Sequence, residues 1–315
     1  MDARAHELAN VLVGNERNQA TLEITMIGPE LIFPEPVLIA LSGAQFDVTV
    51  NGQRCPQDRP VLLSAGARLH ISHAFLGGRA YLAIAGGIQV DPVLGSRSTY
   101  LPASFGGLQG RALRSGDGLP LASDVSELSS ARFARLTERL RTSSMNARTV
   151  NTQSGFSTVR WSVPPMTLPD RDPILVYAMP GLHFEWFNAE ARQKIFQASW
   201  RVSPQSNRIG FRLAGPELVR EKSGDILSGP TCLGTVQVPA SGLPIALMAD
   251  HQTTGGYAKI LEVASVDISR LAQLRPGERL RFVRCSLEEA LALKKRARQS
   301  LDAKIRSIQS EFGAA

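Results

Sequence analysis

One short stretch of this sequence gathers an unusual set of reactive side chains. Residues 250–260 hold an acid, an amide, hydroxyls, a phenol and an amine around the adjacent glycines Gly255 and Gly256. Apolar residues occupy 245–249 and 260–263, so the pattern predicts a strand, a polar loop and a second strand. Adjacent glycines can take positive φ and let the backbone approach a ligand closely. On composition alone, a polar hairpin tip without a ligand explains the stretch equally well.

A second polar segment, Ser206-Asn207-Arg208, stands just before a glycine-punctuated stretch that is typical of a strand. An arginine at the start of a strand can project into a cleft and bind a carboxylate through two parallel hydrogen bonds. A solvated arginine beside a pair of strands is the alternative. We predict that segments 206–208 and 252–257 line one cleft in the second half of the chain.

A third set of residues could bind an anion. The glycines Gly106 and Gly107 could offer backbone N–H groups, and Arg97 and Arg111 could add charged donors. Ordinary turns with surface arginines are the alternative, and the residues alone favour that alternative.

The sequence lacks the signatures of several enzyme classes. It contains no Gly-x-Ser-x-Gly nucleophile elbow, no phosphate-binding P-loop and no dinucleotide fingerprint. No spacing of cysteine or histidine suggests a metal site. His70 and His73 fall in a strand-like segment, where a structural or surface role is favoured. His251 lies in the polar loop, but no nucleophile elbow accompanies it.

Composition limits the class of protein further. The 315 residues suffice for more than one domain, and a hydrophobic content of 43% is ordinary for a globular protein. Three cysteines, an odd number, argue against a disulfide framework and fit a reducing compartment. The apolar runs are too short to span a bilayer and the start carries no apolar signal core, so we expect a cytoplasmic protein.

The net charge of +7 raises nucleic acid as a candidate partner. Most of the excess lies in 132–148 and 279–306, where aromatic residues do not alternate with the basic ones. A solvated basic surface is therefore the better interpretation. We expect neither nucleic acid nor a membrane as a partner.

The pattern of elements predicts a mainly β chain with a few helices. Residues 1–122 form a first β domain, because short apolar runs alternate with turn residues such as Asn51-Gly52. Residues 123–164 are rich in Ser, Arg and Thr and are expected to be a linker with one short helix. Residues 165–286 form a second β domain, and 287–315 a C-terminal helix.

The C-terminal helix has a predicted cap and an apolar face. Ser286 is a favourable N-cap, and Glu288 and Glu289 place negative charge in the first turn. An apolar stripe needs a covering surface, either on another chain of a hetero-oligomer or on the protein's own β domains. The stripe consists of Leu301, Ile305, Ile308 and Phe312.

Several uncommon strings occur in a fixed order: Leu12-Val13-Gly14-Asn15, Leu94-Gly95-Ser96-Arg97-Ser98-Thr99, Ser206-Asn207-Arg208-Ile209-Gly210, Gly215-Pro216-Glu217-Leu218, Gln237-Val238-Pro239 and the 250–260 run. In these strings the chain resembles the allophanate hydrolase subunit 2 family. That family includes the C subunit of 5-oxoprolinase, the KipA proteins and the carboxyltransferase region of urea carboxylase. The resemblance covers roughly 1–290 and implies two cyclophilin-like β-barrels.

The resemblance also implies that the two polar segments of the second domain form a substrate site. Proton transfer or charge stabilisation is then assigned to Asp250, Lys259 and Tyr257. Substrate contacts are assigned to Ser206, Asn207, Arg208, Gln252, Thr253, Thr254, Gly255 and Gly256.

Three functions are consistent with the resemblance. The first is a subunit of an ATP-dependent 5-oxoprolinase, which shares ATP with a KipI-like protein (allophanate hydrolase subunit 1) and a LamB/YcsF-type subunit. The second is a carboxyltransferase acting on urea or a related amide. The sequence has no Met-Lys-Met carrier motif, so biotin would arrive on a separate carrier. The third is a non-catalytic KipA-like regulator that binds a KipI-like partner.

The start of the chain departs from the family pattern. Related sequences usually carry an earlier segment with a Gln-Asp-x-Gly-Arg motif and a first strand, which are not found here. Either the start was assigned to an internal methionine, or the protein is naturally short. If it is short, we expect the first barrel to have an unpaired edge and the protein to be less stable and less active than one extended upstream.

Overall fold

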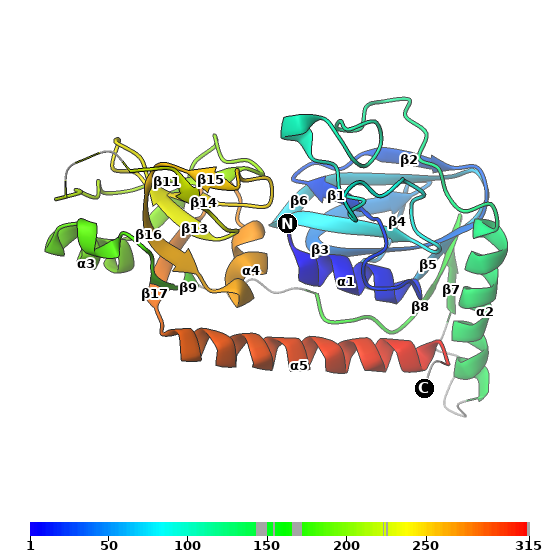
Figure 1. Cartoon of the computed structure of the whole chain (residues 1–315). Helices are drawn as coiled ribbons and strands as arrows, with labels where there is room; N and C mark the ends of the chain where they lie inside the picture. The colour runs from blue at the N-terminus through cyan, green and yellow to red at the C-terminus, as the bar shows by residue number, and fades with distance from the viewer. Residues whose placement is uncertain (143–149, 154, 166–171, 223, 225, 314–315) are drawn as a thin grey trace. The chain divides into compact units, whose positions relative to one another are not determined.

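The computed structural model describes residues 1–142, 150–153, 155–165, 172–222, 224 and 226–313, with the backbone alone at 138–142 and 150–153. The chain folds into two compact units, which are described separately (Figure 1). The barrel unit comprises Met1–Asp2 and Thr167–Gln299, and the sheet unit comprises Ala3–Met166 and Ser300–Ala315. The prediction of a mainly β chain with a few helices and a C-terminal helix is confirmed.

In the sheet unit, the two longest strands, β3 and β6, pair along most of their length and are bent by register shifts between Gly43 and Val48. Its described strands form an eight-stranded sheet in the order β1-β6-β3-β5-β8-β7, with β2 on β6 and β4 on β3. The Asn51-Gly52 turn joins β3 to β4 with positive φ at both residues, as its sequence predicts. The elements are α1 (Ala3–Leu12), β1 (Leu22–Thr25), β2 (Glu30–Phe33), β3 (Val37–Val50), β4 (Gln53–Arg54), β5 (Val61–Leu63), β6 (Ala67–Ile84), a 3-10 turn (Leu101–Ala103), α2 (Val125–Thr142), β7 (Val150–Gln153) and β8 (Phe156–Val159).

Two features of this unit differ from expectation. Its strands form a sheet rather than the second closed barrel. The segment 123–164, expected as a linker, contributes α2 and two strands, and β8 pairs with β5. The β8 side chains Phe156 and Val159 are buried and hold this strand in place. In the sequence, the many Ser, Arg and Thr residues around them hide this apolar pattern.

The barrel unit is a closed barrel in the order β10-β11-β14-β13-β16-β9-β17. Adjacent strands of this barrel are antiparallel, apart from the parallel pair β9–β17. A separate two-stranded ribbon is formed by β12 and β15. The elements are β9 (Ile174–Pro180), a 3-10 turn (Phe184–Trp186), α3 (Ala189–Gln197), β10 (Trp200–Val202), β11 (Gly210–Ala214), β12 (Gly229–Pro230), β13 (Thr235–Val238), β14 (Ile245–Leu247), β15 (Thr254–Gly255), β16 (Ala258–Val263), a 3-10 turn (Ser265–Asp267), α4 (Ile268–Ala272) and β17 (Arg279–Arg284).

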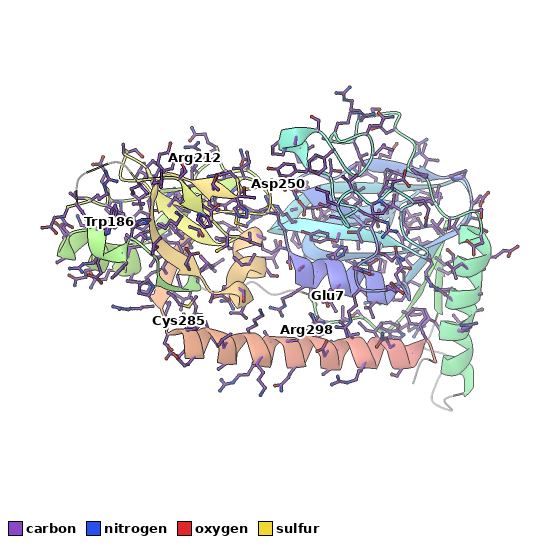
Figure 2. All side chains as sticks on the ribbon, in the orientation of Figure 1. Glu7, Trp186, Arg212, Asp250, Cys285 and Arg298 are labelled. Carbon is purple, nitrogen blue, oxygen red and sulfur yellow. The ribbon has the colours of Figure 1, made fainter. Side chains whose placement is uncertain are left out.

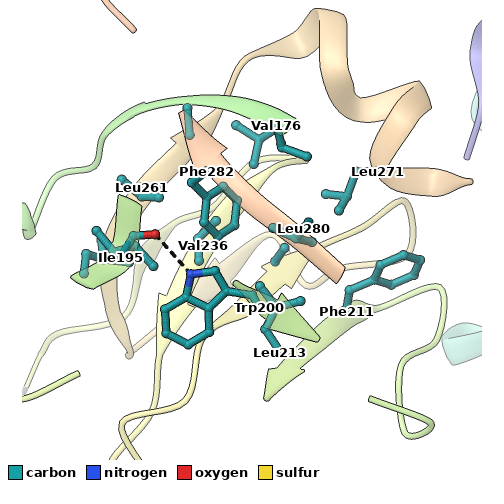
Figure 3. Packing of buried hydrophobic residues seen from close by; sticks show 14 of the residues in the cluster. Val176, Ile195, Trp200, Phe211, Leu213, Val236, Leu261, Leu271, Leu280 and Phe282 are labelled. Atoms are coloured by element: carbon teal, nitrogen blue, oxygen red, sulfur yellow. Dashed lines mark hydrogen bonds between the residues drawn. The ribbon is translucent and has the colours of Figure 1, made fainter. Parts of the chain in front are cut away.

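The barrel core is packed around Trp200, which is fully buried. Its indole Nε1 donates to the carbonyl of Ile195 at 3.0 Å, so its polar atom is satisfied inside the core (Figure 3). A Cβ added to Gly215 would come within 2.6 Å of the Trp200 ring. The glycine of the Gly-Pro-Glu-Leu string is therefore required by the packing of this tryptophan.

The C-terminal helix α5 (Leu287–Glu311) begins with a reciprocal cap. Ser286 Oγ accepts from the Glu289 N–H at 3.2 Å, and Glu289 Oε2 accepts from the Ser286 N–H at 2.7 Å. Leu301, Ile305 and Ile308 are buried in the core of the sheet unit together with α1 residues. The apolar stripe thus docks on the protein's own chain, so it gives no support to a hetero-oligomer.

Candidate functional site

A β-bulge in the barrel turns polar side chains toward one face. Along β13 and β16, Val236 pairs with Leu261, but Gln237 pairs with Lys259, which leaves Ile260 as the extra residue. Ile260 and Leu261 both point into the apolar core. A bulge changes the alternation of a strand and can re-aim a side chain. Lys259 and Glu262, three positions apart, therefore face the same side of the barrel.

Thr235 and Cys232 surround the Glu262 carboxylate. Thr235 Oγ1 donates to Glu262 Oε2 at 2.8 Å, and Cys232 Sγ donates to the same oxygen at 3.3 Å. Burial raises the pKa of Glu262, while these two hydrogen bonds and the charge of Lys259 oppose the rise. A carboxyl group with a raised pKa keeps its proton to a higher pH than usual, which suits a general acid or base.

Lys259 lies beside Glu262, and 4% of its surface is exposed to solvent. Its backbone N–H donates to His183 Nδ1 at 3.1 Å, and its carbonyl accepts from the His183 N–H at 2.9 Å. Burial, and then the charges of Lys259 and Arg220, lower the pKa of His183, which favours the neutral ring. Among the described residues, the Lys259 amine has no hydrogen-bond or ion-pair partner.

Gln237 completes this face from β13. It is 1% exposed, and its Nε2 has no hydrogen-bond partner among the described residues. The ribbon lies directly against it, because a Cβ on Gly255 would come within 2.5 Å of Nε2. A Cβ added to Gly229, the partner of Gly255 in the ribbon, would come within 3.6 Å of the Lys259 amine. We call Gln237, Lys259, Glu262, Thr235 and Cys232, with the covering ribbon, the ribbon site.

Buried donors without partners are costly to a folded protein unless they have another role. The ribbon site holds an amide of this kind, Gln237 Nε2, and beside it the Lys259 amine, under a strip of glycines. Both are donors, so the site is suited to a ligand that presents oxygen acceptors, such as a carboxylate or an amide carbonyl. The neighbouring Glu262 could exchange a proton with that ligand.

Arg208 and Asp250 come together as a pair before the ribbon (Figure 2 labels Asp250). Arg208 Nε and Nη2 donate to the two oxygens of Asp250 at 2.9 and 3.0 Å, and the Asp250 N–H donates to the Arg208 carbonyl at 2.8 Å. The sequence expectation gave Arg208 to a substrate carboxylate and Asp250 to proton transfer. In the structure, Arg208 and Asp250 bind each other, and the pair fixes the start of the loop.

The other expected substrate contacts divide into two groups. Ser206 Oγ accepts from the Arg212 N–H, and Asn207 Oδ1 accepts from the Ile209 N–H, so both side chains shape the turn before β11. A second group of side chains is exposed on the loop. Thr231 fixes the backbone of this loop, because its N–H donates to the carbonyl of Thr253 and its hydroxyl donates to the carbonyl of Gln252. The exposed residues are Gln252, Thr253, Thr254, Gly256 and Tyr257. Whether segments 206–208 and 252–257 line one cleft stays a prediction.

The expected anion site looks different. Arg111 Nη1 and Nη2 donate to the two oxygens of Asp117 at 2.7 and 2.8 Å, which lowers the pKa of Asp117. Arg97 Nε donates to the carbonyl of Val90. Gly106 and Gly107 have positive φ, and a Cβ on either would collide with Ser98 or Thr99. Packing and turn geometry account for these residues without an anion.

Sequence reasoning missed Gln237, Glu262 and His183 as site residues. Gln237 stands in the Gln-Val-Pro string, and both it and Glu262 are polar residues that alternate with buried apolar residues in their strands. That contrast is the signal that could have marked them. The bulge that brings them to one face has no signal in the sequence.

Metal ligands and membrane-spanning helices are both absent from the part of the chain that the structure describes. No three His, Cys, Asp or Glu side chains there are placed to hold a metal ion. No helix within those residues combines the length and apolarity needed to cross a membrane.

Comparison with known proteins agrees with this architecture. The chain is 36% identical to the C subunit of 5-oxoprolinase from Escherichia coli, over 92% of its own length and 83% of the relative's. It is 30% identical to urea amidolyase of Saccharomyces cerevisiae, over 98% of this chain but 16% of that protein. The crystal structure of Kluyveromyces lactis urea carboxylase superposes with a TM-score of 0.81 at 30% identity, over 96% of this chain and 26% of that one. Residues 1–284 match the carboxyltransferase domain, subdomain A and B, and the chain belongs to that family.

Proposed function

We propose that this chain is a subunit of an ATP-dependent 5-oxoprolinase, which opens the 5-oxoproline ring to glutamate together with partner subunits. The observation that carries the proposal is the ribbon site, where the Gln237 amide is buried without a partner among the described residues, next to the nearly buried residue Lys259. The substrate offers matching acceptors, a carboxylate and a lactam carbonyl. The chain also spans 83% of a relative named as the C subunit of 5-oxoprolinase, against 16% of a urea amidolyase.

The proposed chemistry follows from these positions. Lys259 binds the carboxylate or stabilises negative charge that develops on the lactam oxygen, and Gln237 donates to the same ligand. Ring opening breaks the lactam C–N bond, places the OH of water on the carbon and a proton on the nitrogen. Glu262 is placed to deliver that proton. An unstrained lactam resists hydrolysis, and ATP hydrolysis supplies the driving force.

The partners proposed for this reaction are a KipI-like protein and a LamB/YcsF-type subunit. The ATP requirement and the free cysteines Cys55, Cys232 and Cys285 fit a reducing cytoplasm.

A carboxyltransferase is the second candidate, and the family match favours it. The same two donors could bind the carboxyl group of carboxybiotin, brought by a separate carrier, while it passes to the nitrogen of urea or a related amide. A non-catalytic KipA-like regulator is a third candidate, but it gives no reason for the buried, unpartnered Gln237 amide beside Lys259.

The test is to purify the chain with the proteins encoded beside its gene and to measure ATP hydrolysis and product formation. We expect glutamate from 5-oxoproline, with ATP consumed in step. Carboxylation of urea that depends on biotin, without glutamate formation, would instead support the second candidate. A complex that shows neither activity while binding a KipI-like partner would support the third.

A further inference from the structure

The sheet unit contains a cavity of about 740 Å³ that none of the expected sites includes. It lies between the bulged part of β3, the segment 54–59 and the end of β8, with Phe75 of β6 at its side. Pockets that bind small molecules have volumes of about 300–1,000 Å³. The cavity is therefore large enough for an organic ligand.

The wall of this cavity is built rigidly. The Gln57 side chain hydrogen-bonds to the β3 backbone as a neighbouring strand would. Its Oε1 accepts from the Phe46 N–H at 2.7 Å, and its Nε2 donates to the Ala44 carbonyl at 3.0 Å. The Cys55 N–H donates to the Val48 carbonyl at 2.9 Å. The segment that carries the charged residues is thus fixed before any ligand arrives.

Three arginines line the cavity: Arg54, Arg59 and Arg160. Arg59 Nη1 donates to the carbonyls of Val159 and Arg160 at 3.2 Å each, which orients its guanidinium. Its Nε is buried and has no hydrogen-bond partner among the described residues.

The negative charge near these arginines is smaller. Among the lining residues, Asp47 carries the one carboxylate, and its Oδ1 lies 3.9 Å from Arg54 Nη2. Asp58 lies behind the wall, where it accepts from Ser42 and Gln45, and burial raises its pKa. The lining therefore keeps an excess of positive charge.

Aromatic surface lies next to the positive charge. Phe75 is 54% exposed, an unusual exposure for a phenylalanine, and Phe46 and Pro56 extend the apolar wall. Arginines bind phosphate groups, and exposed aromatic rings stack on planar bases. The combination is suited to a ligand with several phosphates and a flat ring.

We propose that this cavity, which we call the arginine pocket, binds a nucleoside polyphosphate. The phosphates contact Arg54, Arg59 and Arg160, and the base packs against Phe75. The pocket stands on its own chemistry, whereas the choice of ATP as its nucleotide rests on the proposed function.

The test is calorimetric titration of the purified full chain with ATP, adenosine and tripolyphosphate. Arg54→Ser/Arg160→Ser removes two phosphate contacts and spares Arg59, which holds β8. Arg68→Ser is the matched control, because Arg68 is an exposed arginine of the same unit, paired with Glu30 outside the pocket. Phe75→Ser tests the base contact.

We expect saturable binding of ATP that the double substitution weakens about tenfold or more, because it removes charged hydrogen bonds. Arg68→Ser should bind like the wild type. Phe75→Ser should weaken ATP and leave tripolyphosphate unchanged. Thermal unfolding of each variant shows whether it is folded.

Absence of saturable ATP binding by the wild-type chain, or equal ATP affinity in the folded double variant, would overturn the proposal. Equal ATP affinity in Phe75→Ser would overturn the assignment of the base. Since binding is measured without turnover, ATP binding at this pocket in a complex inactive on 5-oxoproline would reject the proposed function and retain the pocket.

Discussion

The loop at 250–260 and the loop at 97–117 both combine glycines with charged side chains, yet their charges have different surroundings. In the second loop, Arg111 is held by Asp117 on the surface, so its charge is already matched. In the first, Lys259 and its neighbour Gln237 are buried residues, and the Gln237 amide nitrogen has no hydrogen-bond partner among the described residues. A charged residue beside glycines does not by itself indicate a site, whereas an unmatched buried donor does.

The same contrast exists within the first loop. Arg208 and Asp250 satisfy each other and position the loop, while Lys259 at its far end remains open to a ligand. Residue type marked all three equally in the sequence. Their surroundings separate a positioning pair from a candidate catalytic residue.

Lys259→Met should have the largest effect. It keeps the length of the side chain but removes the amine, and loss of one such donor costs about 10²–10³ in turnover. Burying a methionine is easier than burying an ammonium group, so thermal stability should be unchanged or higher. The measurement is ATP-dependent glutamate release by the assembled enzyme, with Lys194→Met on the surface of α3 as control. Wild-type turnover in Lys259→Met would remove the ribbon site from catalysis.

Gly255→Ala should be next in size. The added Cβ would meet Gln237 Nε2 at 2.5 Å, so the amide or the ribbon must shift. A displacement of this kind can lower turnover by about 10–100-fold. Gly118→Ala, at a position with no atom within 4 Å of the new Cβ, is the control in the other loop. If both alanine variants turn over alike, Gln237 has no part in the reaction.

The third prediction concerns pH. The pKa of His183 is lowered in the folded state, so its contribution to stability is present above its unfolded pKa and is lost as pH falls through the folded value. Protonation would remove the acceptor for the Lys259 N–H and add a charge beside Lys259 and Arg220. The fall in melting temperature between pH 7.5 and 5, both chosen within about two units of the usual histidine pKa, should be smaller in His183→Asn. An equal fall in both proteins would contradict this account.

Arg111→Met should have the smallest effect on activity. Its pair with Asp117 is partly open to solvent, and ion pairs near the surface contribute little. We expect turnover within about twofold of the wild type, since nothing there resembles an unmatched donor. A large loss of turnover in folded Arg111→Met would support an anion site at this loop and contradict the distinction drawn between the two loops.

Local chemistry allowed much of the secondary structure to be predicted from the sequence. Examples are the Ser286 cap, the Asn51-Gly52 turn and the strand–loop–strand pattern around 250–260. Each depends on neighbouring residues, whose preferences act over a few positions. The strands within 123–164 escaped prediction because their burial depends on β5, far away in the chain.

The sequence by itself determined which residue types were available and which short segments would become strands, turns and helices. Tertiary structure alone decided which polar groups became a site. The register between β13 and β16 creates the bulge that turns Lys259 and Glu262 to one face, and the approach of the ribbon leaves Gln237 Nε2 without a partner among the described residues. Register and burial arise from contacts between distant segments, so no local pattern of residues encodes them.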